Sequence, residues 1–212
     1  MASSPYPSRV VILAALLVIG GLVSAVPGTH AQTYGVWGDP TPLPQGEKTV
    51  GGNLLLGNLV GIMGQARFGV MPDGDIGVQL GIPDFDFDFT LAGDWRQSVA
   101  RASDTMPVDI TVNIALGWLR AFGSNGIDFD FGAVFSKELA TAGGQAFTPY
   151  GGLMIAIGYV SGAGTIGGAD YDVHFRGGVQ VPVQNTLGVN AEFQFSSRSN
   201  SAYLTLGATY GF

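Results

Sequence analysis

The sequence predicts an all-β protein, a closed antiparallel up-and-down transmembrane β-barrel of about ten strands, with eight strands as the alternative. Apolar residues alternate with small or polar residues in one segment after another, which is the period of a strand with one apolar face. Helical periodicity is absent. The polar face is also unlike a soluble surface, because it consists mostly of Gly, Thr, Asn, Gln, Ser and Asp, and Lys48 and Lys137 are the only lysines.

Composition supports this class. Charged residues make up 12% of the 212 residues, about half of the ~25% found in globular domains. The acidic balance, without a basic stripe, argues against nucleic acid as a partner. Cysteine is absent, which suits an oxidising route out of the cell. We expect no cofactor and no metal.

The amino end predicts a signal peptide over residues 1–31. Arg9 precedes an apolar run, Val10 to Ala25, and Thr29-His-Ala31 forms a cleavage site before Gln32. The run is shorter than the ~20 residues that a membrane-spanning helix needs. Residues 32–46 form an extended, proline-rich leader, which either hangs in the periplasm or folds into the barrel mouth. Residues 47–212 are the predicted barrel.

Turn chemistry divides the barrel into strands. Pro72-Asp-Gly74 and Ser124-Asn-Gly126 are predicted tight turns, and Ser161 to Ala169 is a predicted glycine-rich loop. The predicted strands are 48–56, 59–71, 75–82, 85–96, 107–121, 127–137, 147–160, 170–182, 187–196 and 202–212. An even number places both ends of the barrel on the same side of the membrane.

The last strand, Ala202 to Phe212, alternates strictly and ends on an aromatic residue. It resembles the closing strand of the bacterial outer-membrane β-barrel superfamily, porin-like and other small barrels, in which a terminal Phe is recognised by the assembly machinery. The resemblance implies a Gram-negative outer-membrane protein, with outer-membrane lipid and the barrel assembly machinery as partners. It implies an assembly signal consisting of Leu204, Leu206, Tyr210 and Phe212. The subfamily and the oligomeric state stay open.

The apolar face is expected to point into lipid, because a charge facing lipid at mid-membrane costs ~2–4 kcal/mol. The charged residues therefore line the lumen. The predicted acidic cluster is Asp84, Asp86, Asp88, Asp128, Asp130, Asp172 and Glu192, and the predicted basic group is Arg67, Arg96, Arg176 and His174. All of the aspartates in the acidic cluster are expected toward the outer mouth.

Three functions follow from such a lumen. The first is a narrow porin-like pore that favours cations or small polar solutes. The second is a structural barrel whose polar lumen is plugged by salt bridges and hydrogen bonds. The third is a barrel-embedded hydrolase that uses Asp172 and His174, which share an inward face. We expect no enzyme, because the predicted outer connections are short and leave little to hold a substrate.

Overall fold

The computed structural model describes residues 39–57, 60–82, 89–121, 124–162, 165–197 and 202–212. Within these ranges, no helix is long and apolar enough to cross a membrane. The strands are β1 (Lys48–Gly57), β2 (Val60–Met71), β3 (Gly74–Ile82), β4 (Phe89–Ala100), β5 (Asp109–Ala121), β6 (Ser124–Ser136), β7 (Leu139–Ala140), β8 (Ala146–Gly162), β9 (Thr165–Pro182), β10 (Leu187–Ser196) and β11 (Ala202–Gly211).

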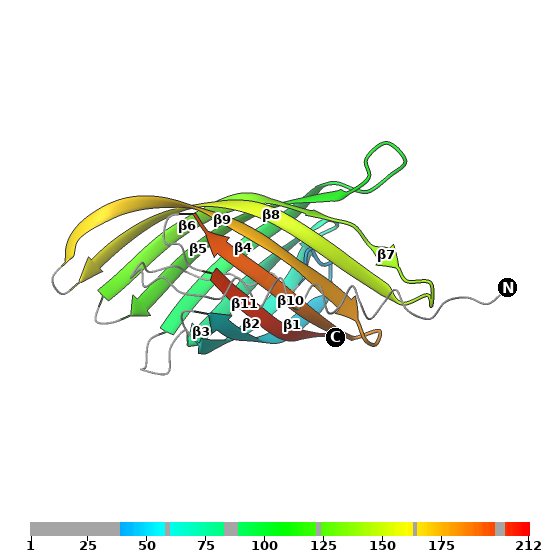
Figure 1. The fold of residues 1–212 in the computed structure, drawn as a ribbon, viewed down its shortest axis with the longest axis horizontal. Coiled ribbons are helices and arrows are strands. Elements are labelled where there is room, and N and C mark those ends of the chain that lie inside the picture. Colours follow the sequence, from blue (N-terminus) through cyan, green and yellow to red (C-terminus); the bar gives the residue numbers. More distant parts are fainter. Residues whose placement is uncertain (1–38, 58–59, 83–88, 122–123, 163–164, 198–201) are drawn as a thin grey trace.

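Ten of these strands close into an antiparallel barrel (Figure 1). Each strand pairs with its neighbours in chain order, β6 pairs with β8, and β1 pairs with β11, from Thr49–Gly211 to Gly57–Tyr203. The two-residue β7 pairs only with β8 and stands outside the ring. The predicted fold and the count of ten are confirmed, and eight strands is wrong.

Two predicted turns are wrong. Ser124-Asn-Gly126 belongs to β6, where it pairs with Gly162, Ser161 and Val160 of β8. The predicted loop from Ser161 to Ala169 is mostly strand, because β8 continues to Gly162 and β9 begins at Thr165. Both segments are rich in Gly, Ser and Asn, which favour turns. Ser124 to Gly126 nevertheless extend because β5 and β8 offer backbone partners on both sides, and the start of β9 extends by pairing with β8.

The barrel has two rims. The start of β1 and the end of β11 meet at one of them, which we call the terminal rim. The connections 72–73, 101–108, 137–145 and 183–186 lie at this rim, and the opposite, distal rim carries the remaining connections. The β4–β5 and β6–β8 connections are the longer ones of these four.

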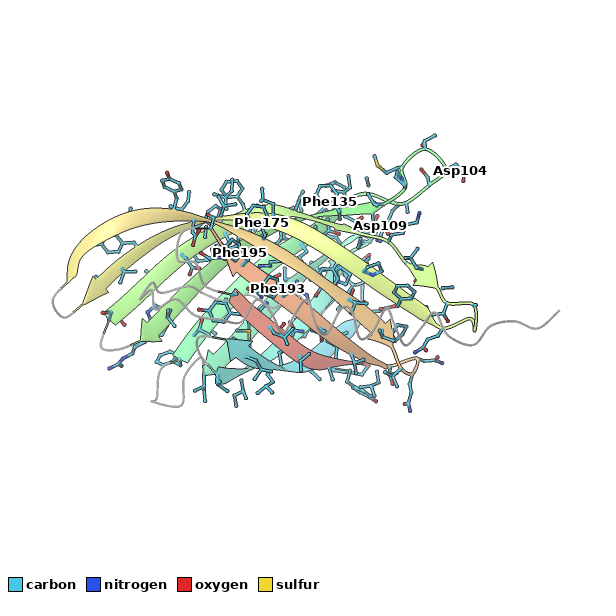
Figure 2. The ribbon with its side chains drawn as sticks, viewed as in Figure 1. Asp104, Asp109, Phe135, Phe175, Phe193 and Phe195 are labelled. Atoms are coloured by element: carbon cyan, nitrogen blue, oxygen red, sulfur yellow. The ribbon has the colours of Figure 1, made fainter. Side chains whose placement is uncertain are left out.

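The two faces of the wall differ sharply in composition. Along β3, Val78 and Leu80 are 50% and 58% exposed, whereas Asp75 and Gln79 are 0% and 3% exposed. Figure 2 shows Phe175, Phe193 and Phe195 along β9 and β10, and Phe175 and Phe195 are exposed. The exterior is therefore apolar and the interior mostly polar, apart from two small apolar clusters, Leu55–Met63–Tyr203 and Val134–Tyr150–Met154. An apolar exterior around a mostly polar interior is the pattern of a barrel in lipid.

Candidate functional site: the polar lumen

One set of bonded charges in the lumen consists of Arg67, Asp75, Asp94 and Arg96, which we call the terminal cluster. Arg67 Nη2 donates to Asp75 Oδ1 at 2.7 Å and to Asp94 Oδ2 at 2.6 Å. Arg96 donates to Asp75 through Nε at 3.0 Å and through Nη2 at 2.7 Å. All four side chains are buried. Two guanidinium groups and two carboxylates thus neutralise one another in a water-poor site, where such bonds are strong.

Gly77 makes the geometry of the terminal cluster possible. Arg67 lies on β2 and Asp94 on β4, and Gly77 is the residue of β3 that pairs with both. A Cβ atom at Gly77 would lie 2.5 Å from Asp94 Oδ1 and would also collide with Arg67 Nη1. The arginine therefore passes over a strand that lacks a side chain at this point.

The described part of the leader, Asp39 to Gly46, folds against the terminal cluster, and we call it the leader segment. The Leu43 backbone N–H donates to Asp75 Oδ2 at 2.8 Å. Arg96 donates through Nη1 to the carbonyl oxygen of Asp39 and through Nη2 to that of Thr41. The described leader residues therefore fold into the barrel mouth, one of the two positions that the sequence leaves open.

The leader segment is also fastened to β2. Gly46 N–H donates to the Gly69 carbonyl oxygen, and Gly69 N–H donates to that of Glu47, each at 2.9 Å. Gly46 has a φ of 90°, which an L side chain rarely adopts. At Gly69 a Cβ atom would lie 2.7 Å from the Pro44 carbonyl carbon. The chain can therefore turn into the rim only because both positions are glycine.

A second polar group, Tyr150, Glu192 and Gln194, lies on the opposite wall, and we call it the Glu192 group. Tyr150 Oη donates to Glu192 Oε2 at 2.8 Å, and Gln194 Nε2 donates to Glu192 Oε1 at 2.6 Å. Glu192 is 0% exposed. Tyr150 on β8 passes over Gly178 of β9 to reach β10, since a Cβ atom at Gly178 would lie 2.6 Å from the Tyr150 hydroxyl.

The same device recurs a third time. Asn190 Nδ2 on β10 donates to Asn53 Oδ1 on β1 at 3.2 Å, across β11. The intervening residue is Gly207, where a Cβ atom would lie 2.6 Å from Asn53 Cγ. In these three side-chain pairs, Arg67–Asp94, Tyr150–Glu192 and Asn190–Asn53, the hydrogen bonds thus join strands separated by one intervening strand. Each crossing lies at a glycine of that strand.

Asp172 and His174, the predicted hydrolase pair, lie toward the distal rim on β9. The Asp172 carboxylate accepts hydrogen bonds from the hydroxyls of Ser196 and Ser197 and from the backbone N–H of Val173. His174 Nε2 is 4.0 Å from Asp172 Oδ2. Asp172 therefore lies between the serine and the histidine, whereas a nucleophilic serine is activated by direct contact with its base. Among the described residues, no cluster of three or more His, Asp or Glu side chains is arranged to hold a metal ion.

The structure places the other predicted lumen residues as follows. Asp128, Asp130 and Arg176 are buried on the inner face of β6 and β9. Asp84, Asp86 and Asp88 lie outside the described residues. Arg67 and Arg96 bond to Asp75 and Asp94, neither of which belongs to the predicted acidic cluster.

Asp75 and Tyr150 are lumen residues that the sequence prediction missed. Asp75 follows directly after the predicted turn Pro72-Asp-Gly74, at the first position of the predicted strand 75–82. Its alternation with Gly77 and Gln79 is the signal that could have identified it. Tyr150 had no such signal, because its partner Glu192 is 42 residues away.

The closing strand pairs with both β1 and β10. Leu206, Tyr210 and Phe212 are exposed on the outer face, and Leu204 is half-buried there. The rings of Tyr210 and Phe212 stack with centroids 6.5 Å apart, and Phe212 N–H donates to the Lys48 carbonyl oxygen at 3.0 Å.

No protein-family model matches the sequence, and no curated protein matches it. Solved structures do resemble the fold. The N-terminal barrel domain of Pseudomonas aeruginosa OprF is 8% identical, with a TM-score of 0.41, and the match covers 80% of this chain and 100% of that domain. The KdgM porin is 8% identical, with a TM-score of 0.42, over 77% of this chain and 99% of the porin. Acinetobacter baumannii Omp33 is 9% identical, with a TM-score of 0.36, over 80% and 98%. At identities of 8–9%, the likeness to these three structures is one of fold alone.

Proposed function

We propose that this protein is an integral β-barrel of the bacterial outer membrane whose polar lumen is plugged near the periplasmic rim. The observation that carries the proposal is the terminal cluster. Its two arginines and two aspartates are 0–8% exposed and bond mutually across three strands. A water-filled channel would leave such side chains wet.

The apolar exterior supports the membrane location. Exposed Val, Ile, Leu and aromatic side chains alternate with buried, mostly polar ones around the barrel. Within the described strands, the exposed lysines and arginines are Lys48, next to the terminal rim, and Arg120, close to the distal rim. Exposing this apolar surface to water would be unfavourable, whereas lipid solvates it. We assign the terminal rim to the periplasm and the last strand to the assembly machinery, as the resemblance of that strand implies.

The lumen dimensions support the plug. A barrel of eight strands is just wide enough to be filled by side chains, and ten strands leave only slightly more room. Here the terminal cluster and the leader segment lie inside the lumen next to the terminal rim, and the buried Glu192 group adds further side chains to the lumen. The two polar groups come from opposite walls.

Single-channel recording in planar bilayers tests the plug. We expect the unmodified protein to insert without current steps. The double variant Arg67→Ala/Asp94→Ala removes one charge of each sign, leaves a gap beside Gly77, and is expected to conduct. Steady current from the unmodified protein contradicts the plug.

A narrow pore that favours cations is the second candidate, and the distribution of charge favours it. The terminal cluster is neutral, but elsewhere in the described lumen only one guanidinium is set against four carboxylates: Arg176, Asp128, Asp130, Asp172 and Glu192. A net negative narrow lumen attracts cations. This candidate is established instead if the unmodified protein conducts K⁺ in preference to Cl⁻. The double variant Asp128→Asn/Asp130→Asn must then lose that preference.

A further inference from the structure

We propose that the terminal rim is a binding site for a peptide backbone, and that the leader segment occupies this site in cis as a seal over the terminal cluster. The inference rests on the proposed function, since it assigns a cover to the plugged lumen. It also identifies the chemistry that holds that cover in place.

The site recognises backbone atoms. Arg96 bonds to the carbonyl oxygens of Asp39 and Thr41, where the chain bends and the Thr41 N–H donates to Asp39 Oδ1. Asp75 accepts the N–H of Leu43. The Arg96 guanidinium donates to peptide carbonyl oxygens, and the Asp75 carboxylate accepts from a peptide N–H. The two charges of one buried ion pair therefore bind the two polar groups of a peptide backbone.

The apolar side chains of the leader segment form the seal. Pro40, Pro42 and Leu43 are buried, with Leu43 only 6% exposed, whereas Pro44 and Gln45 are exposed. Leu43 therefore packs next to the carboxylate that its own N–H contacts. Water is kept from Asp75 and Arg96, and ion pairs in such a dry site interact more strongly than in water.

The same contacts define the ligand class. The four polar contacts with Arg96, Asp75 and Gly69 use main-chain atoms of the segment, and Leu43 is the one buried large side chain other than proline. The rim thus fits a proline-containing peptide backbone that bends ahead of a large apolar residue at the position of Leu43.

Cysteine reporters test whether the segment is seated. The chain has no cysteine, so single substitutions give clean labels. We expect Pro40→Cys to react with a water-soluble maleimide at least about tenfold more slowly than Gln45→Cys, because a buried thiol must wait for local opening. Equal rates in the folded, full-length protein overturn the inference.

A substitution that unseats the segment tests the seal. Leu43→Asp places a carboxylate beside Asp75, so we expect faster labelling of Pro40→Cys and current in planar bilayers. Gln45→Asp, which adds the same charge at an exposed position, is the control and is expected to change neither. Heat-modified mobility on gels confirms that each variant folds.

The outcomes separate the two proposals. Faster labelling without current, in a protein that is otherwise silent, overturns the seal and leaves the plugged barrel standing. Current in the unmodified protein contradicts the plug, and the labelling rates then decide the peptide site alone.

Discussion

Gly77→Ala is the sharpest test of how the lumen is built. The new methyl group would lie 2.5 Å from Asp94 Oδ1 and against Arg67 Nη1. One of the two side chains must withdraw, and both are buried with little room to move. Breaking a buried ion pair by removing one partner costs about 3–5 kcal/mol. Arg67 keeps its bonds to Asp75, so we expect about half of that, partly offset by the ~0.5–1 kcal/mol that alanine gains over glycine in a strand.

The expected loss in the free energy of unfolding is therefore about 1–2 kcal/mol. Urea titration of the protein folded into lipid vesicles, followed by tryptophan fluorescence, measures it; Trp95 lies on β4 beside the cluster. Gly93→Ala is the matched control, because Gly93 is exposed on the outer face and its added Cβ has no neighbour closer than 3.8 Å. If Gly77→Ala and Gly93→Ala are equally stable, the glycine crossing has no energetic role.

Three other predictions use the same preparations. Tyr150→Phe removes a hydrogen-bond donor from the fully buried Glu192. We expect it to lower the free energy of unfolding by about 1–3 kcal/mol in the same urea assay. An unchanged free energy of unfolding would contradict a stabilising role for this hydrogen bond. Deleting Phe212, which is 67% exposed, should cut insertion in cells far more than refolding into detergent; equal, small effects in both assays would make it an ordinary strand residue. His174→Ala should leave protease and lipase assays at background, as the unmodified protein does, and any activity that depends on His174 would restore the hydrolase hypothesis.

The alternation of side chains allowed much of the fold to be predicted. Period two fixes which face each residue occupies, so residues such as Arg67, Arg96 and Glu192 could be assigned to the interior before any pairing was known. Strand ends were less predictable. Ser124-Asn-Gly126 has turn chemistry but lies within β6, because backbone pairing on both sides outweighs local preference.

The partners of the lumen charges could not be predicted. Alternation gives a face but not the stagger between strands, and the bonds here join residues on strands that are not adjacent. Arg67 bonds to Asp94, 27 residues away, across a glycine that nothing in the sequence distinguishes from the other glycines. The leader segment was equally hidden, since its bonds use main-chain atoms that carry no sequence signal.

The strand-skipping bonds also bear on the shape of the barrel. Neighbouring strands lie about 4.8 Å apart, so a bond from one strand to the next but one is a chord across an arc of the wall. Flattening the wall along that arc would stretch the bond, so the bond opposes flattening. The two side chains can meet over the middle strand because that strand carries only a glycine at the crossing. β3, β9 and β11 are therefore the places where curvature is held fixed. A bilayer that squeezes the barrel sideways should therefore deform these three arcs least.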